Sequence, residues 1–296
     1  MYKKQLSGVY APITTPFFED GKLDLQGLKK NMEFYSSSPL QGYLALGSNG
    51  ENKNLVGDEK FDVLKTIVEG KGKNQYVMAG CIAESTYETI ELAKKAEAAG
   101  ADFVTMLPPC YFKKQMSDEV LELYFTDVAS SIKIPCLVYC APQFTGGITL
   151  STALVTKIAK HPNIVGIKDS STGNIDGYLM AAPDDFAVIA GSANFFVSAL
   201  LGGGTGGILS LANAFPQETA NLYDAFVAKD YEKLFELNKR ALKLNKAVSG
   251  KGGVAAVKAA MTLAGLVGGY PRKPLLPLKP QDIETLRDNM KKEGLI

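Results

Sequence analysis

The sequence predicts an α/β fold, a (β/α)8 TIM barrel with a C-terminal helical extension. Three observations predict it. Eight short apolar runs, rich in β-branched residues, alternate with amphipathic helical patterns. The chain has 296 residues, which is long for one ordinary domain but suits an α/β barrel with additions. The alternation stops near residue 229, and only helical patterns follow.

The predicted strands are short, and helices with recognisable starts separate them. Ser85 precedes Glu88 by three residues, which is capping-box spacing. Ser117 stands before two acidic residues, which favour a first helical turn, and Ser151 opens another helix. The eight predicted strands are Val9–Thr15, Gly42–Gly47, Tyr76–Cys81, Asp102–Leu107, Pro135–Ala141, Ile164–Lys168, Phe186–Gly191 and Gly207–Leu211.

A doubly wound open sheet is the alternative to the barrel. That fold would bind a nucleotide at a glycine-rich first turn, but the first strand is followed by Thr14-Thr15-Pro16-Phe17. The run Gly202–Gly207 matches the spacing GxGxxG, yet it leads into a strand rather than a helix. We therefore interpret it as a tight helix-to-strand connection.

The C-terminal part is predicted to be helical throughout. We expect helices over Asp230–Val248, Val254–Leu266 and Gln281–Glu293, with a proline-rich stretch before the last. This gives a barrel over residues 1–229 and a three-helix extension over residues 230–296, packed on the barrel or used in assembly.

Charge and hydropathy exclude several classes of partner. The net charge is +1 with no long run of one sign, which argues against nucleic acid and membrane surfaces. The N-terminal residues lack the apolar core of a secretory signal. The most apolar stretch, Gly252–Tyr270, is interrupted by Lys258, so a soluble helix is favoured there over a membrane span.

The four cysteines and one histidine argue against a disulfide framework, a metal site and a serine-hydrolase mechanism. Cys81, Cys110, Cys136 and Cys140 form no CxxC motif, which is typical of reduced thiols in a cytoplasmic protein. A metal-dependent aldolase or hydrolase would need more imidazoles than His161 alone. His161 also precedes a strand, which is a poor place for a Ser-His-Asp arrangement. We therefore expect no metal cofactor.

Lys168 is the most informative residue. It ends the apolar run Ile164–Lys168, where a lysine is unexpected because lysine is rarely buried without a partner. Burial in an apolar pocket disfavours the ammonium form and favours a neutral, nucleophilic amine, which condenses with ketones. The alternative is a strand-end lysine that reaches solvent along its own stem.

Barrel enzymes place their catalytic groups at the carboxyl ends of strands, and other reactive side chains of this sequence occur at such positions. Tyr139 lies near the end of the fifth strand, and period 2 makes it a neighbour of Lys168 if its face points inward. A phenol beside an amine can relay protons. The Gly47–Gly50 turn offers backbone N–H groups and two small polar side chains suited to a carboxylate, and the alternative interpretation is an ordinary strand-to-helix turn. Tyr111 follows the fourth strand, and a surface aromatic is its simplest interpretation.

Taken together, the motifs resemble the dihydrodipicolinate synthase / N-acetylneuraminate lyase superfamily. The resemblance rests on five segments in order along the chain: Gly8–Phe17, Gly47–Glu51, Tyr139–Pro142, Gly166–Ser170 and Gly191-Ser192. It implies a class I aldolase or lyase on a (β/α)8 barrel that is metal-free and homotetrameric, as a dimer of dimers. It also implies that pyruvate or another small 2-oxo acid binds as a Schiff base.

The resemblance assigns roles to individual residues. Lys168 corresponds to the Schiff-base lysine and Tyr139 to the proton-relay tyrosine. Ser48 takes the hydroxyl position of the relay and, with Asn49, holds the carboxylate. Tyr111 corresponds to the tyrosine that reaches into a neighbouring active site across a dimer interface. Ser170 and Gly191 would line the substrate pocket.

Two departures bear on the substrate. Synthases of the lysine pathway usually carry Gly-Thr-Thr-Gly-Glu where this chain has Gly-Ser-Asn-Gly-Glu at Gly47–Glu51. They also place an arginine two residues after the proline of the fifth-strand motif, to bind the carboxylate of aspartate semialdehyde. Here Phe144 stands there, and phenylalanine cannot replace a bidentate carboxylate donor.

The motifs look most like 4-hydroxy-2-oxoglutarate aldolase, which releases pyruvate and glyoxylate. Dihydrodipicolinate synthase with a different acceptor-binding group and 2-keto-3-deoxy sugar acid aldolase remain open. A hypothesis from another class is a non-catalytic relative that keeps the barrel as a 2-oxo acid sensor or scaffold, and the presence of both Lys168 and Tyr139 argues against it.

Overall fold

The computed structural model describes residues 2–250 and 252–296. Its eight parallel strands form a closed barrel in the order β1 to β8, which confirms the predicted (β/α)8 fold. The chain divides into two compact units, and the strands fall into both. Unit 1 comprises the residues up to Ser7 and Tyr76–Ile208, and unit 2 comprises Gly8–Gln75 and Leu209–Ile296.

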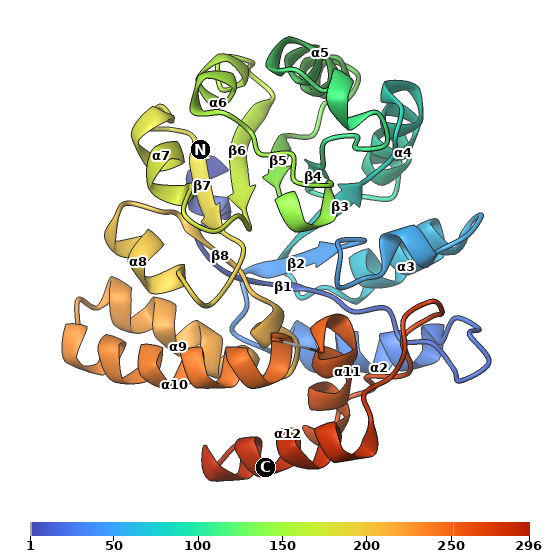
Figure 1. Ribbon diagram of the computed structural model, residues 1–296, viewed down its shortest axis with the longest axis vertical. Coiled ribbons are helices and arrows are strands. Elements are labelled where there is room, and N and C mark those ends of the chain that lie inside the picture. The colour runs from blue at the N-terminus through green and yellow to red at the C-terminus, as the bar shows by residue number, and fades with distance from the viewer. Residues whose placement is uncertain (1, 251) are drawn as a thin grey trace. The chain divides into compact units, whose positions relative to one another are not determined.

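Unit 1 is a run of strand–helix repeats. Helices α4 to α8 lie outside the strands of this unit (Figure 1). Its strands are β3 (Tyr76–Cys81), β4 (Phe103–Met106), β5 (Cys136–Cys140), β6 (Ile164–Asp169), β7 (Ala187–Ala190) and β8 (Gly206–Ile208). Its helices are α1 (Tyr2–Gln5), α4 (Thr86–Ala98), α5 (Asp118–Ser130), α6 (Thr152–Ile158), α7 (Ile175–Ala181) and α8 (Phe196–Leu201), with 3-10 turns η2 (Lys113–Gln115) and η3 (Pro142–Phe144).

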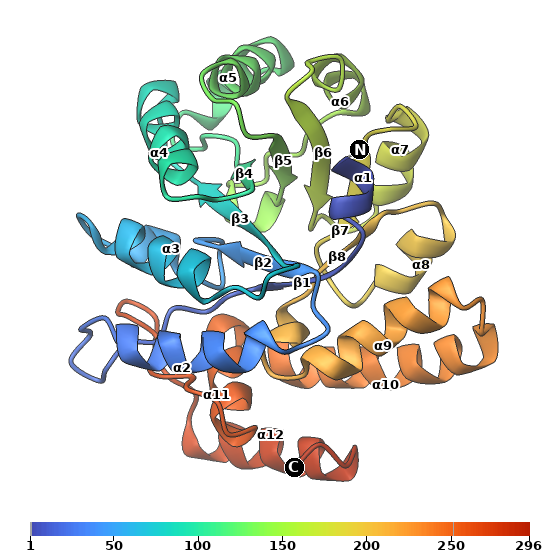
Figure 2. The ribbon, with the colours of Figure 1, turned by 180° about the vertical axis from the view of Figure 1, so that it is seen from behind.

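The predicted helix starts in unit 1 are confirmed. Ser85 Oγ accepts the N–H of Glu88, and Ser117 and Ser151 likewise accept N–H groups of α5 and α6. Each cap satisfies a backbone donor that the first turn of a helix leaves without an intrahelical partner. Helix α1 is tied to the loop that precedes β7, where Lys3 Nζ donates to the carbonyl of Asp184 at 2.9 Å (Figure 2).

Unit 2 holds the first two strands and the C-terminal helices. Helices α9 and α10 run side by side in both views (Figures 1 and 2). Its elements are β1 (Gly8–Pro12), α2 (Leu25–Ser36), β2 (Gly42–Ala45), η1 (Asn52–Asn54), α3 (Glu59–Gly70), η4 (Ser210–Asn213), α9 (Pro216–Val227), α10 (Tyr231–Ser249), α11 (Gly253–Leu263) and α12 (Pro280–Lys292). The three predicted C-terminal helices correspond to α10, α11 and α12. The predicted boundary between residues 229 and 230 separates α9 from α10 and stays a prediction.

Three strands end two or three residues earlier than the sequence predicts: β1 at Pro12 rather than Thr15, β2 at Ala45 rather than Gly47, and β8 at Ile208 rather than Leu211. Strand β2 stops at Ala45 because Leu46 adopts a left-handed conformation with φ 57°, which breaks the pleat. Strand β8 stops at Ile208 because Ser210–Asn213 forms a 3-10 turn. The Gly202–Gly207 run connects α8 to β8, as predicted. Within the described ranges, no helix is both long and apolar enough to span a membrane.

Candidate active site

Lys168 lies at the carboxyl end of β6 and is buried, with 4% of its surface exposed. In the parallel register of β5 and β6 it stands opposite Tyr139. Its Nζ lies 4.1 Å from the centroid of the Tyr139 ring. The predicted neighbourhood of these two residues is therefore confirmed, and the solvent-reaching alternative for Lys168 is wrong.

Apolar side chains surround the phenol of Tyr139. Ile82, Leu107 and Ala141 form a buried cluster with its ring. Ile82 and Leu107 follow β3 and β4 directly, so this cluster gathers at the carboxyl ends of consecutive strands. A buried amine and a buried phenol thus lie side by side, in a setting where electrostatic interactions are stronger than in solution.

Ser170 and Gly191 lie together just after β6 and β7. The N–H of Ser170 donates to the carbonyl of Cys140 at 2.8 Å, and the N–H of Gly191 donates to that of Asp169 at 2.6 Å. A Cβ on Gly191 would lie 1.9 Å from Ser170 Oγ and 2.7 Å from the backbone carbonyl oxygen of Asp169, which cannot rotate away, so glycine is required at this position. The two residues predicted to line a pocket are therefore in direct contact, beside the end of the Lys168 strand.

Asp169 follows Lys168 in the strand, and its carboxylate accepts hydrogen bonds from Ser171. Its Oδ1 accepts the N–H of Ser171 at 3.0 Å and the hydroxyl of Ser171 at 2.6 Å. Burial raises the pKa of this carboxyl, and the two bonds from Ser171 oppose that rise. Period 2 directs Asp169 away from the face of Lys168, so we interpret it as a structural residue.

Tyr111 lies on the exposed loop that follows β4. Its side chain is 79% exposed, and its ring packs edge-on against Phe112 with centroids 5.1 Å apart. The Glu84 carboxylate accepts the N–H groups of Cys110 and Tyr111 at 2.8 and 2.9 Å, which fixes the start of this loop. The arrangement does not bring the Tyr111 ring into the buried cluster around Tyr139.

Phe144 occupies the position where the lysine-pathway synthases carry arginine. It lies in η3, directly after β5, and its side chain is 51% exposed. The neighbouring Gln143 donates to the carbonyl of Ser170 at 3.3 Å, which ties this turn to the end of β6. An exposed phenyl ring at this place offers no hydrogen bond to a carboxylate.

In unit 2, the Gly47–Gly50 turn follows β2. The Gly50 N–H donates to the Gly47 carbonyl at 3.1 Å, and Asn49 Nδ2 donates to Ser210 Oγ at 2.8 Å. A Cβ on Gly50 would lie 3.1 Å from the carbonyl oxygen of Ile13, so the turn packs closely on its neighbour. The half-buried Ser48 and Asn49 lie at the tip of this turn.

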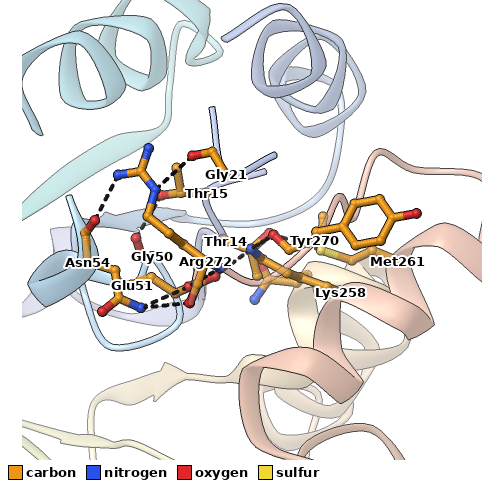
Figure 3. Close-up of polar contacts among 11 residues, drawn as sticks. Thr14, Thr15, Gly21, Gly50, Glu51, Asn54, Lys258, Met261, Tyr270 and Arg272 are labelled. Atoms are coloured by element: carbon orange, nitrogen blue, oxygen red, sulfur yellow. Dashed lines mark hydrogen bonds and ion pairs between the residues drawn. The ribbon is translucent and has the colours of Figure 1, made fainter. Parts of the chain in front are cut away.

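Sequence reasoning missed the residues that support the turn. Lys258 Nζ donates to Glu51, and Arg272 reaches the same carboxylate through its backbone N–H at 2.9 Å (Figure 3). Burial lowers the pKa of Lys258 to about 8, and Glu51 opposes that shift. A lone lysine inside an otherwise apolar helix was the available signal, but its partner lies 207 positions away in the chain.

Comparison with known proteins decides the family. The model of the dihydrodipicolinate synthetase family matches residues 5–293. The chain belongs to the dihydrodipicolinate synthetase family. It is accordingly a carbon–carbon lyase, and the recognition from motifs is confirmed.

Named relatives include two activities. A 4-hydroxy-tetrahydrodipicolinate synthase of Geobacter metallireducens is 34% identical over 293 residues, which cover 98% of this chain and 99% of the relative. A probable mitochondrial 4-hydroxy-2-oxoglutarate aldolase of Emericella nidulans is 31% identical over 287 residues, covering 95% and 93%.

Solved structures of related proteins have the same fold as this chain. The chloride-inhibited synthase of Acinetobacter baumannii complexed with pyruvate aligns with a TM-score of 0.91 and 30% identity, over 98% of this chain and 100% of that one. The prophage protein YagE of Escherichia coli K12, of the same family and in complex with pyruvate, aligns with a TM-score of 0.90 and 28% identity, over 98% and 99%.

Proposed function

We propose that this protein is a class I, metal-independent 2-oxo acid lyase that releases pyruvate through a Schiff base on Lys168. Its best candidate reaction is cleavage of 4-hydroxy-2-oxoglutarate to pyruvate and glyoxylate. The observation that carries the proposal is the buried amine of Lys168, 4.1 Å from the ring centroid of Tyr139 at the carboxyl ends of adjacent strands.

The chemistry uses only groups of the chain and the substrate. The unprotonated amine of Lys168 attacks C2 of the 2-oxo acid, and loss of water gives an imine. A base then takes the proton of the C4 hydroxyl. The C3–C4 bond breaks, its electrons pass into the protonated imine to form a neutral enamine, and glyoxylate leaves. Protonation at C3 and hydrolysis of the imine release pyruvate and restore the amine.

Each remaining site residue has a proposed role in this sequence. Tyr139 would carry protons to and from the substrate, with Ser48 as a second hydroxyl of the relay. Ser48 and Asn49 would hold the carboxylate next to the keto group, and Ser170 and Gly191 would line the pocket. Tyr111 would act in a neighbouring subunit of a homotetramer, which accounts for its exposure in the single chain.

The choice of second substrate rests on Phe144. Aspartate semialdehyde brings a carboxylate that a bidentate arginine would recognise, and an exposed phenyl ring cannot do so. The curated relatives favour the second candidate, a 4-hydroxy-tetrahydrodipicolinate synthase, because several of the most similar bear that name. A 2-keto-3-deoxy sugar acid is the third possible substrate.

Parallel assays of the purified protein distinguish these candidates. We expect pyruvate release from 4-hydroxy-2-oxoglutarate, and little condensation of pyruvate with aspartate semialdehyde. Lys168→Met keeps the buried stem but removes the amine, and we expect it to be inactive. Lys160→Met is the matched control, because Lys160 is exposed just before the same strand. Faster condensation than cleavage would move the assignment to the synthase, and release only from 2-keto-3-deoxygluconate would move it to the sugar acid aldolase.

A further inference from the structure

Two left-handed residues bracket the Gly47–Gly50 turn. Leu46 has φ 57° and Glu51 has φ 52°, and neither is glycine. Such conformations are unfavourable for residues other than glycine and persist only where the surrounding structure holds them. The turn that we propose to bind the carboxylate of the oxo acid therefore needs support from outside itself.

The carboxylate of Glu51 is the centre of that support. It accepts hydrogen bonds from Lys258 Nζ, from the Arg272 N–H at 2.9 Å and from Asn54 Nδ2 at 3.1 Å. Figure 3 shows Lys258 and Arg272 converging on Glu51 from the C-terminal part of the chain. The side chains of Glu51 and Lys258 are 0% and 1% exposed, so this ion pair is withdrawn from solvent.

The two cations are themselves fixed. Lys258 Nζ also donates to the carbonyl of Tyr270 at 2.7 Å and lies 4.7 Å from the ring centroid of Phe17. The guanidinium of Arg272 lies 4.2 Å from the same ring. It forms a bidentate ion pair with Glu59 at 2.6 and 2.7 Å. Every charge in the group is therefore partnered, and its geometry is determined by several independent contacts.

Buried ion pairs add little to net stability, because desolvation offsets their attraction. We therefore interpret this pair by its effect on the conformation of the turn. Other hydrogen bonds hold the same turn. Thr15 Oγ1 donates to the Gly50 carbonyl at 2.8 Å, and Asn52 Nδ2 donates to the Leu46 carbonyl at 2.9 Å. Backbone groups at both ends of the turn are thus held in place.

We propose that the buried Glu51–Lys258 ion pair, together with Arg272, is a positioning group that fixes the Gly47–Gly50 turn in the conformation that binds the carboxylate of the 2-oxo acid. This inference rests on the proposed function. Lys258 acts through Glu51 rather than on the substrate, so it is a positioning residue and not a catalytic one.

The proposal makes a specific kinetic prediction. Loss of the pair should weaken the binding of the oxo acid and leave the amine of Lys168 able to react once the acid is bound. We expect the pyruvate concentration that half-saturates adduct formation to rise by about ten- to a hundredfold, the scale at which small misplacements act. The extent of trapping at saturating pyruvate should stay near that of the native protein.

The experiment measures the borohydride-trapped pyruvate adduct by intact mass over a pyruvate titration. Lys258→Met leaves the Glu51 carboxylate buried without its cation, so this variant alone could fail to fold. The double variant Glu51→Gln/Lys258→Met leaves neither charge behind and keeps both volumes. It therefore provides the decisive comparison.

A matched control separates positioning from simple stability. Asn31 donates to the carbonyl of Val267 at 2.8 Å and accepts its N–H at 2.9 Å, so it ties the same C-terminal segment to α2 without touching the turn. We expect Asn31→Leu to lower the urea midpoint of unfolding and to keep the native half-saturating concentration.

The outcomes are distinct. A raised half-saturating concentration in the double variant, with the control unchanged, supports the proposal. A folded double variant with the native value overturns it, and so does unfolding of the double variant while Asn31→Leu folds, because the pair would then serve folding alone. A native protein that forms no adduct at any pyruvate concentration would instead refute the proposed function.

Discussion

Tyr139→Phe removes one oxygen from the proposed proton relay and leaves the ring. Tyr139 belongs to a buried apolar cluster with Ile82, Leu107 and Ala141, and phenylalanine keeps an aromatic ring in that cluster. The face of the ring that lies 4.1 Å from Lys168 Nζ is also kept. The substitution therefore tests the hydroxyl group rather than the packing of the site.

The expected loss of rate follows from the proposed role of the Tyr139 hydroxyl as an acid–base group. A positioned acid–base group contributes about 10²- to 10⁴-fold to a rate, which corresponds to about 3 to 5 kcal/mol of activation free energy. We expect kcat/KM for pyruvate release to fall by that factor. The free energy of unfolding should change by less than about 1.5 kcal/mol, the scale of one hydrogen bond.

The assay compares steady-state pyruvate release with the rate of borohydride-trapped adduct formation. Both should fall in Tyr139→Phe, because imine formation and C–C cleavage each need proton transfer. Tyr43→Phe is the matched control, since Tyr43 is fully buried and donates its hydroxyl to Gln75 Oε1 at 2.5 Å, at the amino end of β2. It should lose stability and keep the native rate. A Tyr139→Phe rate within about threefold of the native rate would refute a relay through this phenol, because that factor lies far below the acid–base range.

Three further predictions concern specificity, pH and metals. Phe144→Arg should raise kcat/KM for condensation with aspartate semialdehyde by about tenfold or more, whereas Phe144→Leu should not, and equal rates in both variants would contradict the specificity argument. The hydrogen-bonded ion pair with Arg272 holds the pKa of Glu59 below its ordinary range. That pair therefore stabilises the fold above the unfolded-state pKa, and its contribution is lost as pH falls through the folded-state pKa. Urea unfolding between about pH 6 and pH 3 should show a shallower loss of stability in Glu59→Gln than in the native protein, and identical slopes would argue against this linkage. Dialysis against EDTA should leave pyruvate release unchanged, and a loss restored by a divalent cation would require a metal in the reaction.

The barrel could be predicted because its signals are local. Short apolar runs and serine caps such as Ser85 and Ser117 depend on a few neighbouring residues, and all eight strands formed where those signals stood. Strand ends were less predictable. Leucine at position 46 gives no indication of a left-handed backbone. That conformation depends on contacts with the surrounding structure.

The site was predictable to the extent that the topology determines it. Tyr139 and Lys168 meet because parallel neighbouring strands place their last residues side by side, and period 2 chooses the face. Contacts between distant segments could not be derived in this way. The bond from Asn49 to Ser210 and the ion pair from Glu51 to Lys258 join residues 161 and 207 positions apart, and no local pattern specifies either.

The central claim is that Lys168 forms the Schiff base, and peptide mapping of the trapped adduct tests it most directly. The protein is incubated with saturating pyruvate, reduced with borohydride, digested and sequenced by mass spectrometry. The account predicts one added mass on the peptide that contains Lys168, its loss in Lys168→Met and its retention in Lys160→Met. An unmodified Lys168 peptide, or an adduct on another lysine that persists in Lys168→Met, would contradict it.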